Sequence, residues 1–252
     1  MSTAPPLATL DHLVVLASSL ASGVAWAEAT LGVTPGPGGE HPLMGTHNRL
    51  LRLLNGRGQP GAAYLEIIAI NPAAVPTLEP PARRWFDMDD PALRERVAQM
   101  GPQLVHWVAR VPALATALQA WQQMGIERGE ARAASRNTPA GLLQWQISLR
   151  PDGQRLFDGC LPTLIEWGPN HPTAAMPDSG LALQSVTLQH PQAAQLRAAC
   201  QAIGLHEVLI TDGPPRLSAH LSTPHGPLTL FSEKPPSSAH HDPPHPAHPA
   251  RD

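Results

Sequence analysis

The fold is decided by the stretch Leu10-Asp11-His12-Leu13-Val14-Val15, which leads through an alanine-rich segment to Leu31-Gly32-Val33. The first part is an extended apolar run, typical of a buried strand. The segment after it has apolar residues at the spacing of one helix face. Glycine directly after such a segment marks the end of a helix. Residues 10–33 therefore predict a strand followed by a helix.

The same pattern occurs twice more along the chain. The second copy runs from Leu104-Val105-His106-Trp107-Val108 to Met124-Gly125-Ile126, and the third from Leu183 to Ile203-Gly204-Leu205. Repetition of one strand–helix unit indicates a repeated structural module. The chain therefore predicts three related modules.

Further strands follow the helix in the first two copies. Residues 47–53 and 64–68 read as strands in the first copy, and residues 142–149 and 163–167 in the second. A polar or Gly/Pro-rich stretch after each glycine leaves room for one more strand. Each of these modules is therefore predicted to be β-α-β-β-β within an α+β fold.

The third copy is predicted to be shorter, a βα-β module whose last strand begins at Pro227. A Pro/His-rich tail without large apolar residues closes the chain, and its composition is typical of disorder. The predicted segments are a first module at 8–72, a connector at 73–102, a second module at 103–172, a third at 180–233 and the tail at 234–252.

Each of the first two modules carries a histidine in its first strand and a glutamate in its last. His12 precedes Glu66 by 54 positions, and His106 precedes Glu166 by 60. An imidazole or carboxylate inside an apolar strand costs free energy unless it has a partner. Four of them in a repeated pattern suggest a shared partner. The third copy has Ser185 where the others have histidine, so we expect it to be structural.

Composition excludes several classes of function. The formal net charge is −3 with 15% charged residues, which provides no basic surface for nucleic acid or anionic lipid. Two cysteines without CxxC spacing do not indicate a disulfide framework. Residues 1–9 lack the features of a signal peptide, and the apolar runs are too short to span a membrane. We therefore expect a cytoplasmic protein without a nucleotide cofactor.

Several further motifs lie in or beside the predicted strands of the first two modules. They are Gly38-Gly39-Glu40-His41-Pro42-Leu43-Met44-Gly45-Thr46-His47-Asn48, Tyr64-Leu65-Glu66, Ser135-Arg136, Trp145, Leu164-Ile165-Glu166-Trp167-Gly168 and His171-Pro172. Through these residues the chain resembles the glyoxalase-like domain group of the vicinal-oxygen-chelate superfamily, which includes glyoxalases, bleomycin-resistance proteins and dioxygenases. The resemblance covers roughly residues 8–233. It implies tandem βαβββ modules that form a cup-shaped mixed β-sheet, with the first and last strands of each module side by side.

The same resemblance implies a metal site on the floor of the cup, with ligands His12, Glu66, His106 and Glu166. Two imidazoles and two carboxylates suit a divalent ion such as Zn, Ni, Mn, Co or Fe. The ion would polarise a carbonyl, and Glu166, or else Glu66, would take a proton from the adjacent carbon. The implied activity is that of a metal-dependent lyase or isomerase acting on a small carbonyl or hydroxyacid compound.

Loop residues near the expected cup are candidates for contact with substrate, because loops on a rigid scaffold tend to carry specificity. These candidates are His41, Met44, Asn48, Arg136 and Trp145. Arg136 could hold a substrate carboxylate through two parallel hydrogen bonds. Other interpretations stay open: the Gly-rich loop could serve only as a tight turn, Arg136 could be a solvated surface residue, and Trp145 could belong to the core.

Two other functions are compatible with the sequence. The His–Glu pairs could form a metal-free polar pocket in a protein that binds or sequesters a small molecule. A ring-cleaving dioxygenase would use two histidines and one carboxylate, so the two carboxylates here make it the weaker alternative. Both full modules lie in one chain, which predicts a self-contained cup in a monomer or homodimer.

Overall fold

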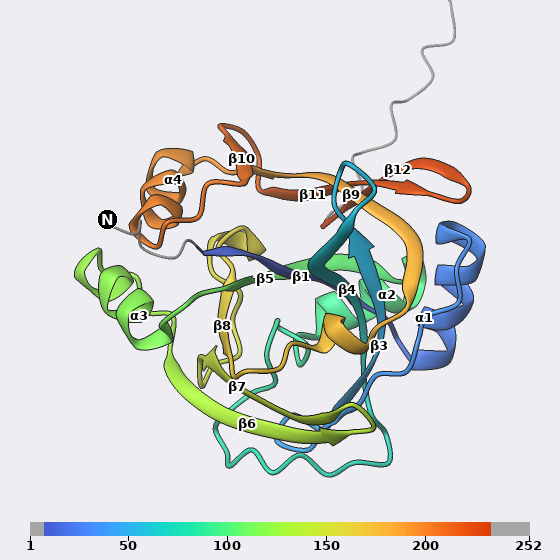
Figure 1. The fold of residues 1–252 in the computed structure, drawn as a ribbon. Helices are drawn as coiled ribbons and strands as arrows, with labels where there is room; N and C mark the ends of the chain where they lie inside the picture. Colours follow the sequence, from blue (N-terminus) through green and yellow to red (C-terminus); the bar gives the residue numbers. More distant parts are fainter. Residues whose placement is uncertain (1–7, 233–252) are drawn as a thin grey trace, which may run out of the picture.

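The computed structural model describes residues 8–232 and contains one large mixed β-sheet with helices at its sides (Figure 1). The first predicted β-α-β-β-β unit is confirmed, with a π-helical turn, η1, that extends its helix. Its elements are β1 (Thr9–Leu16), α1 (Leu20–Trp26), η1 (Ala27–Leu31), β2 (Glu40–His41), β3 (Thr46–Leu54) and β4 (Pro60–Ile70). The predicted disordered tail at 234–252 lies outside the described residues.

The second unit follows the helix α2 (Pro91–Met100) and has the predicted order too. It consists of β5 (Gln103–Arg110), α3 (Leu114–Gln123), β6 (Glu130–Thr138), β7 (Gly141–Leu149), the short helix η2 (Phe157–Gly159) and β8 (Thr163–Trp167). A one-turn helix, η3 (Pro172–Ala175), leads from β8 to the third unit.

The third unit is more complete than the sequence predicted. It consists of β9 (Asp178–Gln189), α4 (Ala193–Ala202), β10 (Val208–Thr211), β11 (Arg216–Thr223) and β12 (Gly226–Phe231). The expected βα-β module therefore has two further strands, β10 and β11. They were missed because β10 has only four residues and β11 joins β12 through a tight hairpin turn.

The helix ends lie where the glycines predict them. Gly32, Gly125 and Gly204 have φ values of 73°, 74° and 73°, the left-handed conformation in which a helix ends and glycine is favoured. At the start of α1, Ser19 and Ser22 form a reciprocal capping box. These local signals fix where each helix turns back toward the sheet.

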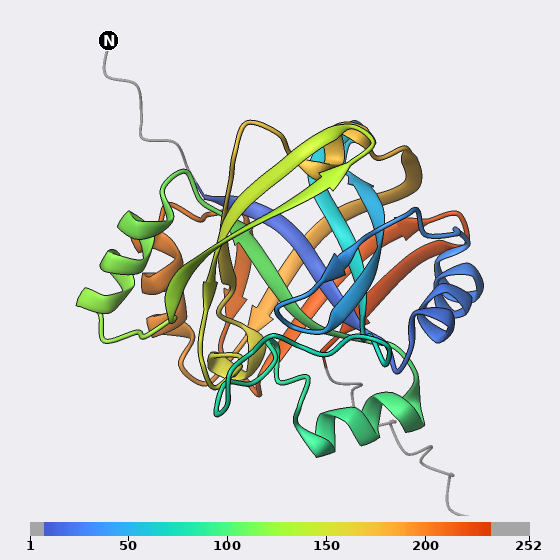
Figure 2. The ribbon, with the colours of Figure 1, turned by 90° about the horizontal axis from the view of Figure 1, so that it is seen from below.

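The strand order brings the first and last strands of the first two units together at the centre of the sheet. The order is β12-β11-β9-β3-β4-β1-β5-β8-β7-β6. β1 is parallel to β4, β5 is parallel to β8, and β1 and β5 are antiparallel neighbours. The sheet curls into the cup that the resemblance implies, as Figure 2 shows from below. Side chains of β1, β4, β5 and β8 on the inner face therefore meet on one surface.

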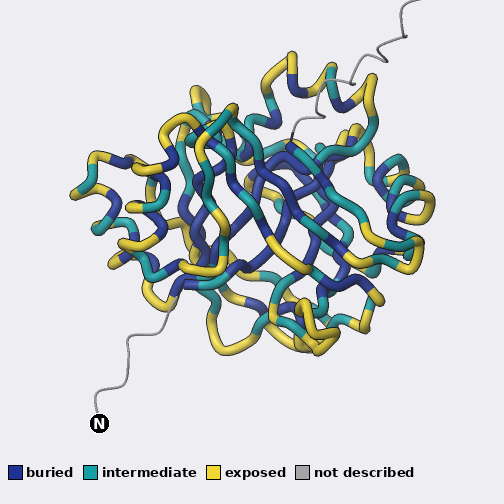
Figure 3. The backbone as a smooth tube through the Cα atoms, turned by 90° about the horizontal axis from the view of Figure 1, so that it is seen from above, coloured by how far each residue is buried: buried dark blue, intermediate teal, exposed yellow. Residues whose placement is uncertain are grey.

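The third unit covers the convex side of this cup. β9 pairs with β3, and β11 and β12 pack against β5. One apolar core joins Leu13 and Trp107 of the first two units to Leu188 and Leu217 of the third. Figure 3 shows these buried strands at the centre, with exposed loops around them. Within residues 8–232, no helix is long and apolar enough to cross a membrane.

Candidate active site

An irregularity in β1 places Asp11 and His12 close together. Alternation along a regular strand would point neighbouring side chains to opposite faces. The pairing of β1 with β5 shifts register between Leu10 and His12, as in a β-bulge, which re-aims a side chain. His12 Nδ1 lies 2.7 Å from Oδ1 of Asp11, and both side chains are buried. A carboxylate–imidazole pair therefore lies in the wall of the cup.

Three hydrogen-bond donors converge on the carboxylate of Asp11. Besides His12, the Trp167 indole donates to Oδ2 at 2.9 Å, and His171 Nε2 lies 3.1 Å from the same oxygen. Burial alone raises the pKa of Asp11, but hydrogen bonds from His12 and His171 and the electrostatic attraction of both imidazoles hold it well below its usual value. Because the ionised carboxylate of Asp11 can only accept, the Nδ1 of His12 that faces it carries a proton, and in the neutral imidazole Nε2 is then left as an acceptor.

Glu66 of β4 faces that free nitrogen. Its Oε2 lies 3.7 Å from Nε2 of His12, and its Oε1 accepts a hydrogen bond from the Asn48 amide at 2.5 Å. The amide oxygen of Asn48 in turn accepts from the backbone N–H of Gly39 at 2.7 Å. Two buried bases therefore face one another. Asp11 holds His12 in place, and Asn48 holds Glu66.

The two bases lie at a small cavity of about 40 Å³, which we call the polar cavity. This volume accommodates about three water-sized positions, which is enough for the oxygens of one small carbonyl–carboxylate head group. Tyr64 forms part of its wall, stacked on His12 with ring centroids 4.5 Å apart. The lining residues are His12, His41, Asn48, Leu50, Tyr64, Glu66, Trp85, Phe86, Arg136, Trp145, Ile147, Ile165, Trp167 and Pro172.

Two hydrogen-bond donors at the polar cavity lack an acceptor within the described residues. They are Nε1 of Trp85 and Nε of Arg136, both shielded from solvent. Buried donors are nearly always satisfied in folded proteins, so each exception calls for an explanation. A carbonyl or carboxylate oxygen bound in the cavity would supply the acceptor.

The two glycines of the Gly-rich loop allow this arrangement. A Cβ atom on Gly38 would overlap Asn48, and one on Gly39 would overlap the guanidinium of Arg136. Glycine is required at position 38, where the overlapped atom is the backbone oxygen of Asn48, whereas at position 39 a side chain would displace the guanidinium. The Gly38-Gly39 pair therefore lets the loop pass between Asn48 and Arg136.

The second-module histidine does not join His12 and Glu66. His106 is fully buried, and its Nε2 accepts from the backbone N–H of Thr163 at 3.2 Å. The same nitrogen lies 3.5 Å from the guanidinium of buried Arg128. Burial, and then the charge of Arg128, lowers the pKa of His106 well below its usual value. The Nε2 lone pair of His106 is therefore engaged, and the side chain does not line the cavity where His12 and Glu66 meet.

Glu166 lies on the opposite face of β8. On the inner face, Ile165 and Trp167 pair with Ile147 and Trp145 of β7. Oε2 of Glu166 instead accepts from the backbone N–H of Leu114 at 2.6 Å, at the start of α3. The predicted convergence of four side chains is therefore not formed.

The residues present do not fit the metal site that the resemblance implies. Only His12 and Glu66 of the four expected ligands meet at the cavity. Across residues 8–232, no group of three or more His, Cys, Asp or Glu side chains is placed to hold a metal ion. A four-ligand site would require His106 to give up Thr163 and Glu166 to cross the sheet.

Of the five expected substrate-contact residues, His41, Asn48, Arg136 and Trp145 line the polar cavity. Met44 is buried beneath the loop and lines neither this cavity nor the larger groove described below. Sequence reasoning missed other residues of the site: Asp11, Tyr64, Trp85, Trp167 and His171. For Asp11 a signal was present, because a charged residue interrupts an apolar run beside His12.

The position of Glu166 leads to a stability prediction. No side chain of the preceding residue, Ala113, caps α3, so the carboxylate of Glu166 takes that role. We expect Glu166→Ala to lower the free energy of unfolding by about 1 kcal/mol, as for loss of a helix cap. Glu166→Gln keeps an acceptor oxygen and should change it by less than about 0.5 kcal/mol. Urea unfolding of both variants at pH 7 tests this, and equal losses would contradict the capping role.

His41 leads to a prediction of pH dependence. Burial lowers its pKa to about 4, with Arg136 adding to the effect and Glu66 opposing it. The unfolded chain therefore binds more protons between pH 4 and 6.5, so stability is lost as the pH falls through this range. We expect wild-type protein to lose about 1–3 kcal/mol more than His41→Gln between pH 7 and 4. Urea unfolding across this range measures the difference, and parallel pH curves would contradict it. His106 contributes equally to both proteins.

Comparison with known proteins identifies the family to which the sequence belongs. The glyoxalase-like domain matches residues 10–204 of the chain. A hypothetical protein from Staphylococcus aureus is similar in structure, with a TM-score of 0.54, 12% identity and coverage of 83% of this chain and 88% of that one. This similarity supports the fold alone.

Two methylmalonyl-CoA epimerases are more distant in structure. The one from Streptomyces coelicolor, in complex with 2-nitronate-propionyl-CoA, has a TM-score of 0.38 and 16% identity, over 66% of this chain and 99% of that one. The one from Mycobacterium tuberculosis has a TM-score of 0.37 and 16% identity, over 70% and 97%. A search of curated protein sequences found no match. The match over residues 10–204 shows that the chain belongs to the glyoxalase-like domain family.

Proposed function

We propose that this protein is a lyase or isomerase that transfers a proton at the carbon next to the carbonyl of a small carboxylated compound. Membership in the glyoxalase-like domain family supports a small-molecule ligand. The observation that carries the proposal is the pair of buried bases, with His12 Nε2 and Glu66 Oε2 facing one another at 3.7 Å. Acid–base catalysis needs groups that are held within reach of the same proton.

The residues around the pair fit the steps of such a reaction. Glu66 takes the proton, and the electron pair of the broken C–H bond moves onto the carbonyl oxygen. The unpaired N–H groups of Trp85 and Arg136 are donors for that oxygen and for the substrate carboxylate. Glu66 then returns that proton to carbon, either directly or by passing it to Nε2 of His12, which delivers it, and this gives the isomer. Asp11 stabilises the positive charge on His12 when it holds the proton.

The proposed proton transfer uses His12 and Glu66 and no metal ion. The metal-dependent form of the reaction, expected from the resemblance, needs His106 and Glu166, which are engaged elsewhere. A ring-cleaving dioxygenase would need two histidines and a carboxylate around one ion, and the described residues offer no such group. His12 and Glu66 both line the polar cavity, beside the N–H donors of Trp85 and Arg136. Acid–base chemistry by these two residues therefore agrees better with the site than metal-dependent chemistry does.

The test is hydrogen exchange of 2-oxo and 2-hydroxy acids in D₂O. The protein is incubated with each acid in the presence of a chelator, and proton NMR follows the hydrogens next to the carbonyl, which are on C3 of a 2-oxo acid and on C2 of a 2-hydroxy acid. We expect the signal of at least one acid to disappear faster than in buffer alone or with heat-denatured protein. If no acid exchanges faster, or if exchange needs added metal, the proposed chemistry is wrong.

A second candidate is a module that binds a small molecule without converting it. It is favoured by a groove of about 400 Å³ beside the polar cavity, which lies within the range of small-molecule sites. Saturable binding of an acid whose hydrogen does not exchange would support this candidate over the enzyme.

A further inference from the structure

We propose that the substrate is amphiphilic and that the groove beside the polar cavity holds its unbranched apolar tail. This inference rests on the proposed function for the identity of the head group. It adds a second subsite and a class of substrate, a carbonyl acid with a hydrocarbon chain of several carbons. We call this subsite the apolar groove.

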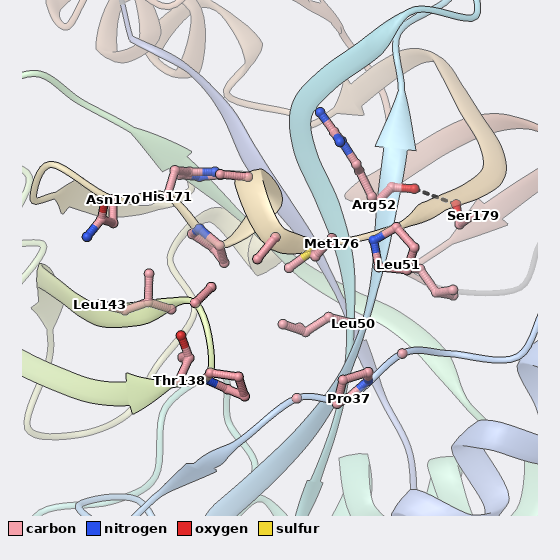
Figure 4. Close-up of a pocket in the computed structure, with 18 of the residues that line it drawn as sticks. Pro37, Leu50, Leu51, Arg52, Thr138, Leu143, Asn170, His171, Met176 and Ser179 are labelled. Atoms are coloured by element: carbon pink, nitrogen blue, oxygen red, sulfur yellow. Dashed lines mark hydrogen bonds between the residues drawn. The ribbon is translucent and has the colours of Figure 1, made fainter.

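The apolar groove has a volume of about 400 Å³ and lies between the loop before β2, the β6–β7 hairpin and the segment around η3. Figure 4 shows Leu50 and Met176 near its middle, with Leu143 and Thr138 on one side and Arg52 and Ser179 on the other. The first two units and the link to the third each contribute a wall.

The groove and the polar cavity share three lining residues. Leu50, Arg136 and Pro172 belong to both. One ligand can therefore reach from the bases to the groove past Arg136. Because the polar cavity holds only a group of about three water-sized positions, the remainder of any larger substrate must lie outside it. The groove is the adjoining space of sufficient size.

The walls of the groove favour hydrocarbon over a charged group. Leu50, Leu143, Met176 and several prolines supply apolar surface. The polar groups at its far end have partners within the protein: Arg52 Nε donates to the Gly61 carbonyl at 3.4 Å, and Asp178 accepts from the Gly180 N–H at 2.8 Å. Arg136, at the inner end, has the unpaired Nε. The pattern is a cation beside the head group and an apolar wall beyond it.

The experiment measures the dissociation constants of straight-chain 2-oxo acids that have from about two to ten carbons beyond the carboxylate. Chains of this range are of the size that a groove of about 400 Å³ can bury. Quenching of tryptophan fluorescence reports binding, since Trp85, Trp145 and Trp167 line the polar cavity. We expect the dissociation constant to fall by about fourfold for each buried methylene, until the groove is filled.

Three variants locate the tail. Ala175→Trp places an indole in the groove from an exposed position on its rim. This variant should abolish the gain in affinity with chain length, while short acids bind with the wild-type affinity. Ala133→Trp is the control, an exposed alanine of β6 that lines neither cavity, and it should keep the gain. Met176→Ala enlarges the groove and should move the best fit to a longer chain.

The outcomes separate this inference from the proposed chemistry. Equal affinity across the series, no binding by any member, or a chain-length gain that survives Ala175→Trp would each overturn the groove assignment. A gain that Ala175→Trp abolishes, combined with absence of hydrogen exchange, supports the groove and overturns only the proposed reaction. Exchange of short acids without any gain in affinity supports the reaction and overturns only the groove.

Discussion

Glu66→Gln is expected to reduce the rate of hydrogen exchange by about 10²–10⁴-fold, the usual contribution of a general acid or base. Glutamine has the shape of glutamate and an amide oxygen that can still accept from Asn48. It cannot take up a proton at neutral pH. The fold should therefore persist while the base is lost. The measurement is the exchange rate by proton NMR in D₂O, with circular dichroism and urea unfolding to establish that the variant is folded.

The matched control is Glu166→Gln, the same substitution at the other glutamate that the sequence proposes as a base. Because Glu166 caps α3 on the opposite face of β8, we expect its variant to exchange at the wild-type rate. A large loss of exchange rate in Glu166→Gln, with no loss in Glu66→Gln, would contradict the site described here. It would restore the assignment that the repeated pattern alone suggests.

The fold follows from the sequence because its signals are local. Apolar runs, helix-spaced residues and the glycines at 32, 125 and 204 each act within a few residues, and each has the predicted structure. Repetition strengthens these signals, because three copies of one pattern must share one arrangement. The short strand β10 escaped prediction because four residues carry too little periodicity.

The site follows only in part because it depends on register. Alternation in β8 correctly separates Glu166 from Trp167, but it does not say which of them faces the cup. That is settled by pairing with β5 and β7, where Ile165 and Trp167 lie on the inner side. Both faces of β8 carry large apolar residues, so no pattern of polarity marks the inner one. The expectation that the second module copies the first therefore failed at Glu166.

Asp11 and Trp85 were missed for different physical reasons. A register shift in β1 turns Asp11 toward His12, against the alternation rule that sequence reasoning applies. Trp85 comes from the connector between the modules, where Phe86 and Asp87 have positive φ. Nothing periodic in that segment indicates which side chain reaches the cup. Where irregular backbone sets the direction of a side chain, the periodicity of the sequence cannot predict it, and it is seen only in the structure.

Asp11→Asn is expected to lower the exchange rate by at least about 10²-fold, because it changes the proton on His12. The carboxylate of Asp11 accepts from His12, Trp167 and His171. Asparagine has one acceptor oxygen, and its NH₂ group would face a donor. If that NH₂ group donates to Nδ1 of His12, the imidazole proton moves to Nε2 and points at Glu66. The two bases would then bind one another instead of substrate.

The same substitution should lower the free energy of unfolding by about 1–3 kcal/mol at pH 7, because buried donors lose their acceptor. The pKa of Asp11 in the folded protein lies below its value in the unfolded chain. The stabilisation by Asp11 is therefore complete at neutral pH and is lost as the pH falls below about 4. Urea unfolding at pH 7 and pH 3 should show that the difference in free energy of unfolding between wild type and Asp11→Asn is smaller at the lower pH.

Asp212→Asn, at an exposed carboxylate, is the control and should leave both the exchange rate and the free energy of unfolding near the wild-type values. A variant at Asp11 with a normal exchange rate would mean that His12 acts without its carboxylate, and the paired-base site would have to be redrawn around Glu66 alone.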